Sequence, residues 1–243
     1  MNESLKGSFK LKESSTMKKF FLILTIIILV LIAGIIGITA SQRRFTVTTG
    51  RLERLTNQTL PLTTQPRQLH LAVRTAQVTI RTGSTPAITL NQVAKSQYKV
   101  EATADRLSIT EPLAHQHQLA IGHTPTITIT LPTDQVDRLQ INQLNGTLKL
   151  HALTINTVQI THQNGTTTAD HLTVRQGGSL IKRNGATTLT DLITQGLQVS
   201  VKTGQAKLNG QRVASNHQSY HQAGQHPLII RSGNGQVKLT TAE

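Results

Sequence analysis

Histidines and carboxylates are the side chains of this chain that could hold a metal ion or move a proton. The densest histidine groups are His115 with His117, and His217 with His221 and His226. Two histidines one residue apart on a strand share a face, where their ring nitrogens can ligate a metal. No carboxylate cluster accompanies either group. We therefore interpret them as loop histidines and predict no metal site and no cofactor.

Asp170 and Asp191 are the best candidates for acid–base chemistry, because they occupy nearly equal positions in two successive repeats of the chain. Enzymes that cleave polysaccharides need such paired carboxylates. We interpret both as corner residues in turns. No phosphate loop, GxSxG elbow or HExxH helix is present. The sequence thus predicts no catalytic residue and no enzyme, with a carbohydrate-active enzyme as an alternative.

The chain is strongly basic and poor in aromatic residues. Its formal net charge is +14, aromatic residues make up 2% of it, and cysteine is absent. The lack of cysteine excludes disulfides and thiolate metal sites. Because the basic residues are spread singly and aromatic stacking platforms are missing, we predict no nucleic-acid partner. The charge instead favours contact with anionic wall polymers or glycans, more strongly in acid as histidines protonate.

One long apolar segment lies near the N-terminus. Residues 20–40 carry no charge, and a helix of that length spans roughly 32 Å, enough for a bilayer core of about 30 Å. Five lysines precede the segment and two arginines follow it, which favours a cytoplasmic N-terminus. We predict a basic cytoplasmic tail (1–19) and a single transmembrane helix (20–40). Secretion after signal cleavage is the alternative, although the segment is longer than a typical signal core.

The segment after this helix divides into two parts. Residues 41–66 contain Pro61 and Pro66 among Thr and Gln, which indicates a polar stalk. The alternation in residues 45–48 offers another interpretation, a first strand. From Leu69 onward, apolar and polar residues alternate with a period of two, which predicts strands. We therefore expect an extracellular β domain over residues 67–243.

Glycines recur through the second half of this domain at intervals of 19 or 20 residues: Gly146, Gly165, Gly185, Gly204 and Gly224. The first three follow Asn, and Asn-Gly is a tight-turn sequence. Aliphatic residues recur at equal distances after these glycines. The period predicts an all-β fold, a parallel β-solenoid of about 19–20 residues per coil. We expect successive coils to stack about 4.8 Å apart, with right-handed crossovers and the five glycines as structural turns.

Residues 127–150, ITITLPTDQVDRLQINQLNGTLKL, carry a family resemblance. An alternating strand ends in Leu131-Pro132, a second strand contains Leu139 and Ile141, and Asn145-Gly146 opens a third. This pattern resembles the bacterial putative-adhesin, DUF4097-type β-strand repeat domains, over residues 67–243. The resemblance implies a parallel β-solenoid at the cell surface, often behind a membrane anchor, with no catalytic residues. The coils after Gly204 depart from the pattern, so irregular closing coils are expected.

These observations together predict a membrane-anchored cell-surface domain with a non-catalytic role in interaction, adhesion or envelope sensing. Its expected contacts are anionic wall polymers or glycans. The alternative is an envelope-stress accessory protein that acts through membrane protein partners.

Overall fold

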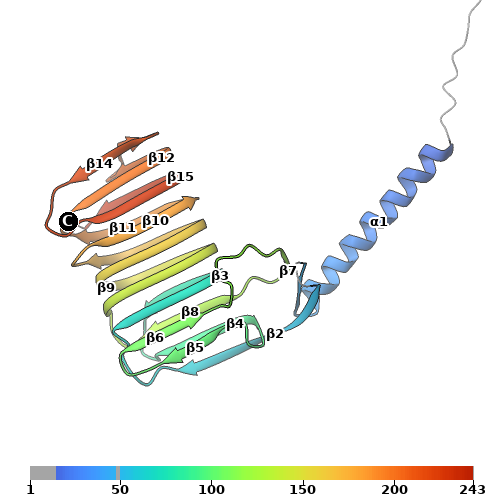
Figure 1. Ribbon diagram of the computed structural model, residues 1–243, viewed down its shortest axis with the longest axis horizontal. Helices are drawn as coiled ribbons and strands as arrows, with labels where there is room; N and C mark the ends of the chain where they lie inside the picture. Colours follow the sequence, from blue (N-terminus) through green and yellow to red (C-terminus); the bar gives the residue numbers. More distant parts are fainter. Residues whose placement is uncertain (1–14, 48–49, 243) are drawn as a thin grey trace, which may run out of the picture.

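The computed structural model describes residues 15–47 and 50–242 and consists of one helix followed by strands (Figure 1). Helix α1 (Ser15–Ala40) contains an apolar span, Met17–Ala40, whose most apolar stretch has a mean hydropathy of 3.2 and which is long enough to cross a membrane. It begins before the predicted Phe20. Most of the predicted tail (1–19) lies outside the described residues.

The strands follow one another in the second part of the chain. They are β1 (Arg43–Thr46), β2 (Arg51–Pro61), β3 (Gln68–Thr82), β4 (Ala87–Ala94), β5 (Lys99–Ala102), β6 (Arg106–Thr110), β7 (Ala120–Gly122), β8 (Thr126–Leu131), β9 (Gln135–Val174), β10 (Gly178–Asn184), β11 (Thr187–Thr194), β12 (Leu197–Leu208), β13 (Gln211–Ser215), β14 (Gln218–Gln222) and β15 (Leu228–Thr241).

The segment predicted as a stalk (41–66) is largely built into the sheet. β1 pairs antiparallel with β2, and β2 pairs antiparallel with β4. The alternation of residues 45–47 therefore predicted the structure of this segment better than its prolines did. Pro61 is tolerated because it is the last residue of β2, where its missing N–H does not interrupt the pairing.

Parallel pairing between segments about twenty residues apart produces the β-solenoid-like stack. β10 lies beside β9, with Asn184 opposite Asn164. β11 continues the same layer, with Leu189 opposite Ala169. On the other side, β3 runs parallel to the start of β9, so that Leu69 faces Leu139. Figure 1 shows the resulting series of parallel rungs.

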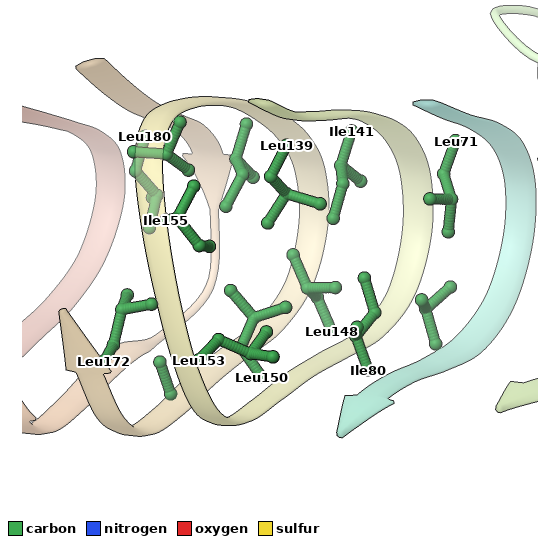
Figure 2. Packing of buried hydrophobic residues seen from close by; sticks show 14 of the residues in the cluster. Leu71, Ile80, Leu139, Ile141, Leu148, Leu150, Leu153, Ile155, Leu172 and Leu180 are labelled. Carbon is green, nitrogen blue, oxygen red and sulfur yellow. The ribbon is translucent and has the colours of Figure 1, made fainter. Parts of the chain in front are cut away.

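The core is a thin aliphatic column enclosed by these coils (Figure 2). The aliphatic side chains of the first repeat are buried, and they are Leu148, Leu150, Leu153, Ile155, Val158 and Ile160. Figure 2 shows several of them meeting Leu71 and Ile80 of β3 and Leu172 of the next layer. Branched aliphatic side chains fill this narrow space, which explains how the domain folds with so few aromatics.

The order of the coils differs from the predicted order. β15 is the last strand in the chain, yet it lies between β10–β11 and β12. Ile230 of β15 faces Leu180 of β10, and Val199 of β12 faces the same Ile230. From Leu197 onward, β12 therefore stacks on β15 and not on the preceding repeat. The apolar patterns of β12 and β15 are alike, so periodicity alone cannot rank them.

Antiparallel strands cover both ends of the stack. β13 and β14 pair antiparallel with β12 at one end, and β4 pairs antiparallel with β8 and β2 at the other. An uncovered parallel strand would present unpaired backbone groups to other chains. The predicted irregularity after Gly204 is this closing hairpin.

Candidate functional site

The predicted glycine turns mark one corner of the stack. Gly146, Gly165, Gly185 and Gly204 have φ between 109° and 127°. A Cβ at Gly165 would collide with the carbonyl oxygen of Gly146, and each of the other three meets the preceding layer in the same way. Only glycine fits this close approach of backbones. Gly224 lies outside the column against Gln195 and Gly196, and Gly235, with φ of 144°, occupies the column between Gly185 and Gly204.

Asparagines beside these glycines form a hydrogen-bonded ladder along the stack. The side-chain amide of Asn164 donates to Asn145 at 2.9 Å, that of Asn184 to Asn164 at 2.7 Å, and that of Asn234 to Asn184 at 2.8 Å. Asn145 in turn donates to Thr75 at 3.2 Å. The ladder fixes the register of the corner, and with it the position of every outward column.

One outward column of side chains contains several basic residues. It consists of the residue three positions after each corner glycine, together with Arg212 beside Lys207. Its members are Lys149, Thr168, Thr188, Lys238, Lys207 and Arg212, and we call this set the lysine–threonine stripe. The strand register places Thr188 beside both Thr168 and Lys238, and Lys207 beside both Lys238 and Arg212. Lys149, Lys238 and Arg212 are exposed. Within the described residues, none of these four cations forms an ion pair.

Asp170 and Asp191 come together at a second corner, as the equal repeat positions suggested. The Nδ1 atom of His171 lies 2.9 Å from an Asp170 carboxylate oxygen, and its Nε2 atom lies 3.3 Å from Asp191. His151 contacts the other oxygen of Asp170 at 3.1 Å. His171 and Asp191 both have φ near 50°, so the corner is a stack of left-handed residues.

This corner cluster offers one nitrogen and two carboxylate donors within 4.8 Å of one another. Such a set suits a divalent cation such as Zn²⁺. The His171 and Asp191 side chains are 65% and 42% exposed, and the ring of His171 already bridges both carboxylates. An acid–base pair needs one carboxyl group kept protonated by burial, and this exposed corner does not provide that burial.

The other predicted histidine groups are not gathered into metal-ligating sets. His115 and His117 are exposed between β6 and β7. His217 lies in the turn between β13 and β14, His221 lies on β14, and His226 follows that strand. In the part of the chain that the structure describes, the corner cluster is the one group of three such ligands.

A buried polar cluster inside the stack escaped the sequence reasoning. Lys182 is 2% exposed and His162 is fully buried. The Nζ atom of Lys182 donates to Thr167 Oγ1 at 3.0 Å and lies 3.3 Å from His162 Nδ1. Burial lowers the pKa of Lys182 to about 8, and burial together with the charge of Lys182 lowers the pKa of His162 to about 4.

Lys182 and His162 each lie three positions before a corner glycine, and this position points into the stack. Ser232 lies in the same column, and the hydroxyl groups of Ser232 and Thr187 are buried without a hydrogen-bond partner. A comparison of inward positions across the repeats would have shown Lys182 and His162 where aliphatic residues were expected. The lysine–threonine stripe was hidden for another reason. β13 and β14 separate Lys207 from Lys238 in the chain, so the repeat period does not pair these two lysines, which the register of β12 with β15 places side by side.

The repeat geometry agrees with the family comparison, in which the Toastrack DUF4097 model matches residues 67–243. The chain belongs to the Toastrack DUF4097 family. No protein with a curated description matches the sequence.

Solved structures give this Toastrack domain a known fold. A cell adhesion protein from Clostridium sporogenes, described as putative, matches with a TM-score of 0.55 and 14% identity, over 77% of this chain and 100% of that one. A putative adhesin from Bacteroides fragilis matches with a TM-score of 0.35 and 9% identity, over 76% of this chain and 96% of that one. At these identities the first likeness supports the fold, and neither assigns an activity.

Proposed function

We propose that α1 anchors the protein in a membrane, with the N-terminus cytoplasmic and the Toastrack domain outside. The apolar length of α1 and the lysines that precede it support this orientation. The exposed domain is a parallel β-solenoid with right-handed crossovers. Its role is non-catalytic, which agrees with the exposed carboxylates of the corner cluster.

The ligand of the domain is an anionic polymer of the cell envelope, a wall polymer or an acidic glycan. The single observation that supports this proposal is the lysine–threonine stripe, in which four cations lie in one column and form no ion pair with any residue of the described ranges. Successive layers are about 4.8 Å apart. A polymer lying along the stack therefore meets lysine ammonium groups at intervals, with the hydroxyl groups of Thr168 and Thr188 between them to donate hydrogen bonds.

A polymer pull-down tests the stripe. The full chain in detergent is incubated with immobilised poly(glycerol phosphate), and with neutral dextran for comparison. We expect retention on the phosphate polymer that disappears at moderate salt, because exposed charges are screened within about 10 Å at 0.1 M. The stripe variant carries Lys149→Gln, Lys207→Gln, Arg212→Gln and Lys238→Gln, and we expect it to lose at least tenfold in affinity.

A variant of equal charge change controls for net charge. It carries four glutamines at exposed arginines outside the stripe: Arg81, Arg106, Arg138 and Arg175. Equal loss of binding in the two variants would show that total charge matters and the stripe does not. Capture of membrane proteins without any polymer binding would instead support the accessory role through protein partners.

The anchor needs a separate test. Immunoblots of membrane and culture-supernatant fractions should find the full-length chain in the membrane fraction. Recovery only in the supernatant, with an N-terminus near Ser41, would refute the anchor and establish signal cleavage.

A further inference from the structure

The part of the domain nearest α1 differs from the rest of its surface. β1 follows the helix directly and pairs with β2 and β7. The His123 ring contacts the carbonyl oxygen of Thr39 in the last turn of α1 at 3.0 Å. Figure 1 shows β7 and the start of β2 at the helix end, with β12 and β14 at the opposite end of the stack. We call residues 43–47, 50–54, 94–97 and 111–125 the collar.

Exposed apolar side chains are concentrated on this collar. Leu113 is 52% exposed and Leu119 is 67% exposed, and both lie in the loop between β6 and β7. Val47 and Leu52, beside the helix end, are 44% and 48% exposed. Elsewhere on the described strands and loops, exposed large apolar residues occur singly. Such a group of apolar residues in one place indicates a contact surface.

A partly buried arginine, Arg74, holds the loop that carries Leu113 and Leu119. Arg74 donates from Nη2 to the carbonyl oxygen of Pro112 at 2.6 Å and from Nε to that of Leu113 at 3.3 Å. It also bonds to Gln118, and its backbone N–H donates to Glu111 at 2.6 Å. The loop therefore holds Leu113 and Leu119 in a fixed position. Because the loop is already ordered, it loses little conformational entropy when these leucines insert into an apolar environment.

The collar also contains a cavity of about 550 Å³ with an excess of positive charge. Arg44, Arg51, Arg74 and Lys95 line it, against the two carboxylates Glu53 and Glu111. Arg44 is only 8% exposed, and its guanidinium group donates to Gln97 at 2.5 Å. Within residues 15–47 and 50–242, Arg44 forms no ion pair. An anion is the ligand that such a cavity favours.

We propose that the collar docks on the outer leaflet of the membrane and that its cavity binds the phosphate of an anionic phospholipid headgroup. Leu113 and Leu119 insert beside that lipid, at the depth where apolar side chains leave water. The occupant is a lipid because the helix that ends at this site already lies in the bilayer, so this inference rests on the proposed anchor. Each basic residue near an anionic leaflet contributes about fivefold to binding.

A single fluorescent label reports this docking. The chain has no cysteine, so Leu52→Cys provides one attachment site on the collar and Ile193→Cys provides one far from it. Ile193 is 53% exposed and lies on β11. The full chain is placed in nanodiscs of phosphatidylcholine alone, or with 30% phosphatidylglycerol, both containing a lipid with a nitroxide on its headgroup. We expect at least twofold stronger quenching at the collar label with phosphatidylglycerol, and no such difference at Ile193.

Charge variants decide whether the cavity is responsible. Arg51→Glu with Lys95→Glu should remove the preference for phosphatidylglycerol. The matched control, Arg212→Glu with Arg231→Glu at the opposite end, should keep it. Equal quenching in both lipids, or equal effects of the two variants, overturns the docking proposal. Loss of the chain from the nanodiscs would instead overturn the anchor, so the two failures are distinguishable.

Discussion

Replacement of the buried lysine in the core should stabilise the domain and flatten its dependence on pH. Lys182 is 2% exposed, and its Nζ atom contacts Thr167 and His162 without a carboxylate partner. A buried cation without a counter-ion destabilises the folded state. We expect Lys182→Met to fill the same volume with an apolar side chain and to remove that penalty.

The magnitude follows from the change in pKa on folding. A pKa that falls from 10.5 to about 8 corresponds to about 3 kcal/mol of lost stability at neutral pH. The unfolded chain binds more protons than the folded one between these two pKa values, so the free energy of unfolding rises with pH across this window. Between pH 8 and 9.5 the rise should be about 2 kcal/mol. The replacement also loses the hydrogen bond to Thr167, about 1 kcal/mol, so its net gain at pH 7 is about 2 kcal/mol.

Urea denaturation of the full chain in detergent, at several pH values from 4 to 9.5, measures these effects. The series stops at pH 9.5 because burial raises the pKa of Tyr98, so ionisation of this tyrosine in the unfolded chain lowers stability above pH 10. His162 adds an acid effect: its pKa is lowered from 6.5 to about 4, so stability falls as pH decreases through that interval. This fall should be smaller in Lys182→Met, where the neighbouring charge is gone.

Lys202→Met, at an exposed position, is the control and should change the free energy of unfolding by less than about 0.5 kcal/mol. The reasoning is refuted if wild-type stability is flat between pH 7 and 9.5, or if Lys182→Met is less stable than wild type at pH 7.

Two further substitutions test the packing of the stack. Leu150→Asp should lower the free energy of unfolding by more than about 4 kcal/mol, because it opens a cavity and buries a charge in the aliphatic column. Ile193→Asp, at an exposed position, is its control. Equal melting temperatures of these two variants would contradict the assigned register. Gly165→Ala should prevent stacking, because its Cβ meets the carbonyl oxygen of Gly146. Gly210→Ala is the control: its Cβ has no atom within 4 Å, and its φ of 82° should cost only about 1–2 kcal/mol of stability. Circular dichroism with thermal melting compares the two variants, and similar losses of stability would count against close backbone packing at the corner.

The repeat layers were predictable from the sequence, since period-two alternation and the glycine interval both follow from local geometry. Leu148 and Leu150 are buried as their positions after Gly146 required. The order of the layers was not predictable, because β12 and β15 present similar inward faces and the repeat pattern does not rank them. β13 and β14, which pair antiparallel with β12, interrupt the repeat and have no signal in its period.

Among the candidate surfaces, too, the sequence predicts some contacts and cannot predict others. Asp170 and Asp191 could be expected near each other because their repeats are adjacent in both chain and space. Lys207 and Lys238 could not, because β13 and β14 separate them in the chain by more than one repeat. The collar depends on contacts of α1 and β1 with the segment around β7, which lies much later in the chain and shares no periodicity with them.

The position of β15 constrains how the protein matures. β15 pairs with β10 and β11 on one side and with β12 on the other. Because β15 follows β12 in the chain, β12 cannot take its place in the stack until residues 228–241 have been synthesised. We expect a chain cut before Leu228 to lack the strand that joins these layers.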